Sequence, residues 1–162
     1  MHHWTGSILR SPSPATGTDA VADCIFCTIV AGDAPAHVVL DDDVAMAFLD
    51  TRPLFVGHTL LVPRDHHETL GDLPSELVEP LFARARRLSQ IMETRLGAMG
   101  SFVAMNNKIS QSVPHLHVHV VPRNRKDGLR GFFWPRTTYD SDSHAAAVAA
   151  ELAAAYEADP VE

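Results

Sequence analysis

The sequence has few cysteines, no long apolar run and no excess of positive charge, and each absence excludes a class of protein. Two cysteines in 162 residues do not make a disulfide-built secreted scaffold. No stretch is long and apolar enough to span a bilayer, and residues 1–20 lack the apolar region of a signal peptide. We therefore expect a cytoplasmic protein with no membrane partner.

The formal net charge of −7 disfavours binding to a nucleic-acid polymer, which usually needs a basic surface. A small phosphorylated ligand remains compatible with this charge, because a local cluster of donors is enough to bind it. Histidine, in contrast, is abundant, with ten residues in the chain. So many imidazoles in one chain indicate a site of chemistry.

Residues 1–22 are rich in Ser, Pro, Thr and Gly and are expected to form a flexible leader, followed by a single domain over 23–162. No internal repeat is visible. Apolar residues recur at helical spacing over Ser75–Leu96, and Gly97 supplies a stop. An Ala-rich helix is expected over His144–Tyr156.

Short apolar runs predict the remaining elements. The apolar segment Cys24–Val30 predicts a short helix or a turn. Strands are predicted at Val38–Leu40, Val44–Leu49, Thr59–Val62, Ser101–Met105 and Leu116–Val121. About five antiparallel strands with a long helix between them indicate an α+β fold, in which a sheet is layered with helices.

Three histidines alternate in the run His115-Leu116-His117-Val118-His119. On a strand, residues two apart share a face about 6–7 Å from each other, so the three imidazoles would point to one side. The apolar residues between them would point to the other side, where a helix can cover them. An ordinary core does not gather three imidazoles, because each needs a polar partner.

Three interpretations of this run remain open. The first is attack on phosphorus by His117, which needs one neutral ring nitrogen aimed at the phosphate, the other protonated and held, and neighbouring donors for the phosphate oxygens. The second is metal ligation, since His-x-His on a strand is a common way to present two ligands. The third is three unrelated surface histidines.

Together with several other blocks, the run resembles the histidine triad (HIT) family of nucleotide hydrolases and transferases. The family pattern is His-x-His-x-His followed by two apolar residues, which is His115–Val121 here. Other matching blocks are Cys24–Val30, Ala47–Asp50, Gly57–Arg64 and Gln111–Val113. The blocks keep the family's order from about Asp23 to Arg123. The resemblance implies a HIT-like fold for residues 23–162, and a homodimer through the long helix and the adjoining strand.

The resemblance also implies roles for individual residues. His117 matches the nucleophile, which forms a nucleotidyl-histidine intermediate that water hydrolyses. His115 would orient it through its backbone carbonyl, His119 would contact phosphate oxygen and assist the leaving group, and His58 would lie on the phosphate side. Implied substrate contacts are Asp50 at the ribose, Ile25, Phe26 and Phe48 around the base, and Asn106, Gln111 and Ser112 near the phosphate or leaving group.

The sequence differs from the family pattern in two places. The link Asn107–Ser110, which borders the phosphate pocket in the family, is shorter than usual and has no glycine. The segment Gly128–Arg136 has no strong counterpart. We expect it either to line the site or to contribute Phe132, Phe133 and Trp134 to a dimer or core patch.

The Cys-x-x-C pair of Cys24 and Cys27 can bind metal or do redox work. Some family members bind zinc with this pair, a histidine after the Pro-Arg/Lys step and the first triad histidine. The resemblance therefore implies a structural zinc on Cys24, Cys27, His66 and His115, a set that suits tetrahedral coordination. His67 is the alternative to His66, and two buried thiols are the alternative to a metal.

The leading functional hypothesis is a hydrolase or nucleotidyl transferase that acts at the α-phosphate of nucleoside phosphoramidates or dinucleoside polyphosphates. Its expected substrate is a purine nucleotide, and no catalytic cofactor is expected, since histidines and backbone donors meet the phosphate charge. One alternative is a nucleotide-binding regulatory protein with vestigial catalysis. Another is a metal-dependent hydrolase with His115, His117 and His119 as ligands.

Overall fold

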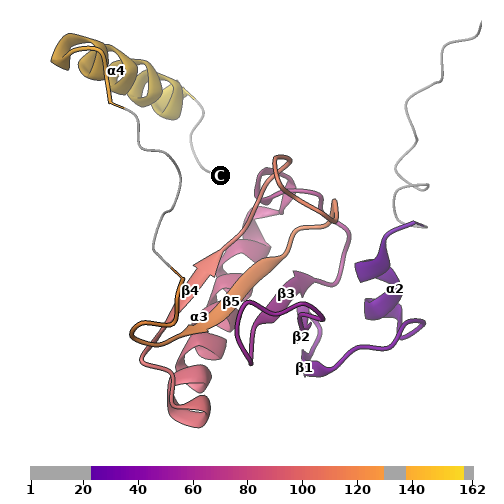
Figure 1. The fold of residues 1–162 in the computed structure, drawn as a ribbon. Helices are drawn as coiled ribbons and strands as arrows, with labels where there is room; N and C mark the ends of the chain where they lie inside the picture. Colours follow the sequence, from indigo (N-terminus) through magenta and orange to yellow (C-terminus); the bar gives the residue numbers. More distant parts are fainter. Residues whose placement is uncertain (1–22, 130–137, 159–162) are drawn as a thin grey trace, which may run out of the picture. The chain divides into compact units, whose positions relative to one another are not determined.

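The computed structural model describes residues 23–129 and 138–158, so the expected leader 1–22 and most of the segment 128–136 lie outside the described residues. The chain divides into two compact units, Met1–Asn124 and Arg125–Glu162. Among the described residues, the first unit contains the sheet with the helices α2 and α3, and the second contains α4 (Asp142–Ala158) (Figure 1). Among the described residues, no helix combines the length and apolar character needed to cross a membrane.

Five strands form one antiparallel sheet in the order β1-β2-β3-β5-β4. Their bounds are Val38–Asp41 for β1, Ala45–Leu49 for β2, Thr59–Pro63 for β3, Gly100–Ala104 for β4 and Val118–Arg123 for β5. The first four strands agree with the predicted bounds to within one residue. The α+β fold with a five-stranded antiparallel sheet is therefore confirmed.

The helices also follow the sequence pattern. The long helix α3 (Ser75–Leu96) has the predicted bounds, and it ends where Gly97 takes a left-handed conformation with φ 66°. The predicted short helix is α2 (Ile25–Ala31), which begins directly after Cys24. A single turn of 3-10 helix, η1 (Leu70–Asp72), precedes α3.

The strands β2 and β3 are buried on both faces of the sheet, to which their alternate residues point. In β2, Ala45 and Ala47 join the core under α3, whereas Met46 and Phe48 join a second core that includes Phe26 of α2. Figure 1 shows α3 running along one side of the sheet. The opposite face, next to α2, is the face on which the histidines gather.

The predicted start of the last strand is wrong. Strand β5 begins at Val118, not at Leu116, because the Leu116 N–H donates to the carbonyl of His67 at 2.6 Å instead of joining the ladder. The predicted alternation of faces is nevertheless confirmed. Leu116, Val118 and Val120 all lie in the core under α3, and only His119 of the three triad histidines is within the strand.

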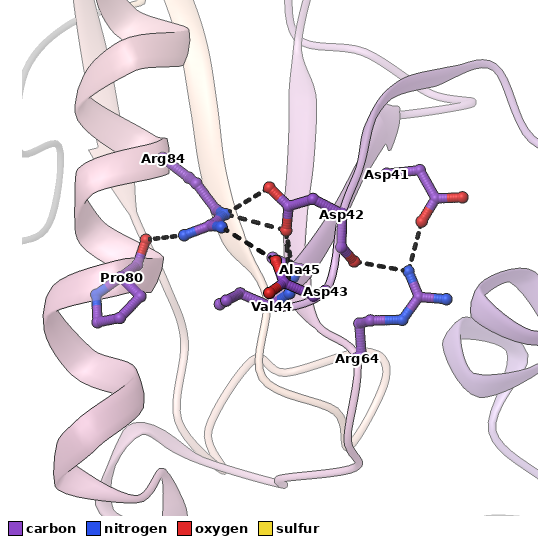
Figure 2. A network of polar contacts seen from close by, with 8 residues as sticks. All are labelled: Asp41, Asp42, Asp43, Val44, Ala45, Arg64, Pro80 and Arg84. Atoms are coloured by element: carbon purple, nitrogen blue, oxygen red, sulfur yellow. Dashed lines mark hydrogen bonds and ion pairs between the residues drawn. The ribbon is translucent and has the colours of Figure 1, made fainter.

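An ionic contact, which we call the hairpin clamp, ties the β1–β2 turn to α3 (Figure 2). Asp42 Oδ1 accepts the N–H groups of Val44 and Ala45 at 3.0 Å each, which closes the turn. The other oxygen of Asp42 lies 2.8 Å from Arg84 Nε, and Arg84 Nη1 donates to the carbonyl of Pro80 at 2.8 Å. The clamp fixes the turn on the side of the sheet that α3 covers.

Candidate active site

A cavity of about 750 Å³ opens beside α2, a volume within the usual range of small-molecule sites. Seven of the predicted site residues line it: Ile25, Phe26, Phe48, Asp50, Ser112, His117 and His119. They come from α2, from the end of β2 and from the segment that enters β5. The fold therefore brings together residues that are almost 100 positions apart in the chain.

One end of the cavity is apolar and aromatic. The Phe26 and Phe48 rings meet edge to face with centroids 5.5 Å apart, and Phe26 also lies edge-on to His117 at 5.2 Å. Ile25 adds an aliphatic side chain from the same turn of α2. Such a wall suits a flat heterocycle, because aromatic and aliphatic side chains can pack against an uncharged ring.

Asp50 lies at the end of β2 and connects the apolar wall to the histidines. Its Oδ1 accepts the backbone N–H of Arg52 at 2.8 Å, and its Oδ2 lies 3.6 Å from Nδ1 of His58. The carboxylate is partly exposed, so it keeps acceptor capacity for hydroxyl groups of a ligand.

The ring of His117 is oriented by the main chain. Its Nδ1 lies 2.7 Å from the carbonyl oxygen of His115, and the side chain is only 3% exposed. Because a carbonyl can only accept, Nδ1 carries the proton and Nε2 carries the lone pair. This is the arrangement that attack on phosphorus requires: one nitrogen protonated and held, and the other free.

His58 and His119 form a second pair beside the nucleophile, with His58 Nε2 2.9 Å from His119 Nδ1. Burial, and then the neighbouring His117 and His58, lower the pKa of His119 to about 4 against the opposing effect of Asp50. Burial also lowers the pKa of His58, again against the effect of Asp50. Both imidazoles are therefore neutral near pH 7.

The positions of these rings argue against a metal held by the three triad histidines. Within residues 23–129 and 138–158, the metal-type clusters are Cys24, Cys27, His66, His115 and Asp50, His58, His119, and neither contains His117. In the second cluster the facing nitrogens of His58 and His119 are 2.9 Å apart. Two nitrogens bound to one zinc at about 2.0–2.1 Å and at tetrahedral angles would stand about 3.3 Å apart, so the 2.9 Å contact fits a hydrogen bond between the rings better.

The first cluster brings four possible zinc ligands within 4.8 Å of one another. His66 Nδ1 lies 3.2 Å from the sulfur of Cys27, and His115 Nδ1 lies 3.4 and 3.5 Å from the sulfurs of Cys24 and Cys27. Sulfur and nitrogen bound to one zinc stand about 3.6 Å apart at tetrahedral angles. His115 Nε2 also donates to the Pro63 carbonyl at 3.1 Å, which leaves the Nδ1 lone pair facing the sulfurs.

The thiols themselves favour a shared cation. Burial, and then the neighbouring sulfur of Cys24, raise the pKa of Cys27 to about 11. Two thiolates side by side would therefore not persist near neutral pH without a positive charge between them. The predicted four donors thus fit zinc, and His67 lies outside the cluster.

Comparison with known proteins identifies the family. A model of the HIT domain matches residues 31–126 of the chain. The chain belongs to the HIT family. An adenosine 5′-monophosphoramidase of Saccharomyces cerevisiae is 34% identical over 135 residues, covering 82% of this chain and 81% of that protein. Nucleotide hydrolysis is therefore an activity found in the family.

Solved HIT structures share the fold. A HIT-family protein from Bacillus subtilis is 31% identical with a TM-score of 0.74, covering 82% of this chain and 96% of that chain. A zinc-bound histidine triad family protein from Mycobacterium smegmatis is 36% identical with a TM-score of 0.64, covering 84% and 99%. The second structure shows that a HIT protein can hold zinc.

Asn106 and Gln111, to which the resemblance to the HIT family assigns substrate contacts, do not line the cavity. They lie in a loop held by hydrogen bonds. Asn106 Nδ2 donates to the carbonyl of Ser110 at 3.2 Å. Gln111 Nε2 donates to the carbonyl of Glu68 at 2.6 Å, and its Oε1 accepts the N–H of Lys108 at 2.7 Å. These bonds hold the loop after β4 against the chain before η1, and the role of both residues toward a ligand stays a prediction.

Some residues lining the HIT cavity are absent from the sequence-based site. Ile29 lies one helical turn after Ile25 in α2, and that spacing was a usable signal. His37 and Arg52 also line the cavity, but they lie in irregular segments where no periodicity marks them. They add an imidazole and a guanidinium group to a lining that also contains the polar side chains of Asp50 and Ser112.

Proposed function

We propose that this HIT protein hydrolyses nucleoside phosphoramidates or dinucleoside polyphosphates, or transfers their nucleotidyl group, through a covalent intermediate on His117. Nε2 of His117 attacks the α-phosphorus, forming a P–N bond as the bond to the leaving amine or phosphate breaks. Water then cleaves the P–N bond and releases a nucleoside monophosphate. The observation that carries the proposal is the 2.7 Å bond from His117 Nδ1 to the carbonyl of His115.

The order of groups along the cavity supports a nucleotide substrate. The aromatic wall of Phe26 and Phe48 would take the base, and Asp50 would accept the ribose hydroxyls. His117 and His119 would then meet the α-phosphate. A purine base is favoured by the adenosine 5′-monophosphoramidase among the relatives. A catalytic metal is not needed in this scheme, because N–H donors meet the phosphate charge.

The test is replacement of the nucleophile. His117→Ala should lower turnover of adenosine 5′-phosphoramidate by about 10⁴-fold or more, while binding of adenosine monophosphate changes by less than about tenfold. Arg86→Ala, at an exposed residue of α3 that does not line the cavity, is the control and should retain full turnover. Mass spectrometry of the rapidly quenched wild type should find the nucleotidyl group on the peptide that contains His117.

Other outcomes would contradict the proposal in distinguishable ways. Unchanged turnover in His117→Ala would exclude this residue as the nucleophile. Nucleotide binding without turnover of either substrate class by the wild type would favour the regulatory alternative, in which the same cavity only binds.

We also propose a structural zinc on Cys24, Cys27, His66 and His115, supported by the donor geometry and by the zinc-bound relative. When bound, the ion would neutralise the thiolates and join the start of α2 to the segment that carries the nucleophile. The two free cysteines also fit the reducing cytoplasm that we propose as the location.

A homodimer through α3 and β4 is the partner that we propose. β4 lies at the edge of the sheet, and Met99 and Val103 leave apolar surface exposed along it. An unpaired edge strand next to an apolar surface favours association. Sedimentation equilibrium at micromolar concentration should give the mass of two chains, and the mass of one chain would contradict this proposal.

A further inference from the structure

The geometry points to a positioning role for the backbone N–H of Leu54. Through His58 it sets the tautomer of His119, so that His119 offers an N–H from Nε2 to the substrate. This inference rests on the proposed function, since it assigns a proton within the same site.

The first link is the contact of Leu54 with His58. The backbone nitrogen of Leu54 lies 3.2 Å from Nδ1 of His58. An amide N–H can only donate, so Nδ1 must accept, and the single proton of the neutral ring is on Nε2. The ring is 3% exposed, so water does not offer an alternative partner that would free it.

The loop between β2 and β3 holds this contact in place. The N–H of His58 donates to the carbonyl of Phe55 at 2.9 Å, and the N–H of Asp50 donates to the carbonyl of His58 at 3.0 Å. The chain therefore turns back on itself between Asp50 and His58, which brings the amide of Leu54 to the ring. The contact belongs to the path of the main chain and not to the side chain of Leu54, which is exposed.

The second link is the contact of His58 with His119. With its proton on Nε2, His58 donates to Nδ1 of His119 across 2.9 Å. Nδ1 of His119 then holds a lone pair, and the proton of that neutral ring is on Nε2, the nitrogen left for a ligand. His117 has the opposite tautomer. The site thus offers one lone pair from His117 and one N–H from His119.

The alternative tautomers are disfavoured on geometric grounds. A proton on Nδ1 of His58 would face the N–H of Leu54, and Asp50 Oδ2 at 3.6 Å is beyond hydrogen-bond distance. His58 would then have no proton for His119. A His119 ring with its lone pair toward the cavity would repel a phosphate oxygen. The observed chain instead places a donor there without adding a charge.

Direct detection of the tautomers tests this inference without any substitution. In the full-length protein labelled with ¹⁵N-histidine, long-range ¹H–¹⁵N correlation spectra near pH 7 should show His58 and His119 protonated at Nε2, and His117 protonated at Nδ1. A proton on Nδ1 of His58 or of His119 would overturn the inference.

Variants at position 58 test the consequence for the reaction. The amide nitrogen of a glutamine reaches about where His Nε2 stands, so His58→Gln can still donate to His119, whereas His58→Ala cannot. We expect His58→Gln to keep the Nε2 proton on His119 and to lose less than about tenfold in turnover. His58→Ala should show mixed tautomers and lose about 10²–10³-fold. Equal behaviour of the two variants would contradict the chain.

Variants at position 54 test the amide itself. Leu54→Ala retains the N–H and should leave all three tautomers unchanged, whereas Leu54→Pro removes it and should give mixed tautomers at His58. If the proline variant does not fold, the wild-type spectrum decides. Turnover combined with an Nδ1 proton on His119 would refute this inference alone, and the expected tautomers without turnover would refute the proposed function alone.

Discussion

Two polar networks in this protein have bonds of similar length and opposite character. The hairpin clamp joins Asp42 to Arg84 at 2.8 Å, with side chains 30% and 22% exposed. The chain from Leu54 through His58 to His119 has a central bond of 2.9 Å and a His58 side chain that is 3% exposed. The first network keeps its charged groups in contact with water, whereas the histidines of the second network are buried and uncharged.

The pKa shifts express the same contrast. Burial raises the pKa of Asp42, but Arg84 and the N–H groups of Ala45 and Val44 together lower it, so the acid stays ionised. Burial lowers the pKa of His119 to about 4, so the base stays neutral. A shift in one direction thus preserves charge in an acid and removes it from a base. Once neutral, the histidines differ only in where their protons lie.

The largest expected effect is at the cysteine–histidine cluster. A bound metal ion would allow the buried thiols to be ionised there, in contrast to the neutral histidine chain. Protein free of added metal and tags should contain about one zinc per chain, and Cys24→Ser should abolish it. Loss of the ion should lower the free energy of unfolding by roughly 3–5 kcal/mol, because a buried thiolate and two imidazoles lose their partner. Elemental analysis and urea unfolding measure both quantities. Zinc far below one per chain in the wild type would refute the site.

A smaller effect is expected from pH on the histidine chain. The pKa of His119 falls from 6.5 to about 4 on folding, so the unfolded chain binds more protons between these values. The contribution of the neutral His119 to the free energy of unfolding is fully present above about pH 6.5 and is lost as the pH falls toward 4. The loss should be about 2 kcal/mol after allowance for partial exposure. Urea unfolding from pH 7 to 4 should show it, and His119→Asn should flatten the slope. Equal slopes in both proteins would contradict the assignment.

The smallest effect is expected at the hairpin clamp. Arg84→Met should lower the free energy of unfolding by no more than about 1 kcal/mol, and high salt should shrink the difference, because water and ions screen an exposed pair. Turnover should not change. Arg86→Met, on the same helix but outside the clamp, is the control. Thermal unfolding at low and high salt measures the effect. A salt-independent loss of several kcal/mol would contradict the prediction, because it would show that the ion pair is not screened by water.

Local sequence patterns were sufficient for most of the fold. The bounds of α3 could be predicted because helical spacing and Gly97 mark them within the segment itself. The start of β5 could not, because the bond from Leu116 to the carbonyl of His67 depends on a residue far away in the chain. The loop with no glycine is a further case. Lys108 and Ser110 take φ angles of 66° and 59°, the region that glycine favours, so the backbone path is formed without glycine.

The side chains of the site were largely predictable and its protons were not. The spacing of the triad and the order of the blocks indicated His117, His119 and Asp50, which line one cavity. Arg52 and the amide of Leu54 left no signal, because an irregular segment has no period and a backbone group is common to almost every residue type. Which nitrogen carries a proton depends on contacts that only the folded chain creates.

In three places a main-chain group decides the state of a ring: the carbonyl of His115 for His117, the amide of Leu54 for His58, and the carbonyl of Pro63 for His115. Point mutation exchanges side chains and leaves these atoms behind, with proline at position 54 as the exception. Most substitutions at these residues therefore leave the protonation states of the site histidines unchanged. An insertion or deletion between Asp50 and His58, which would move the amide itself, is the kind of genetic change to which these protonation states are most vulnerable.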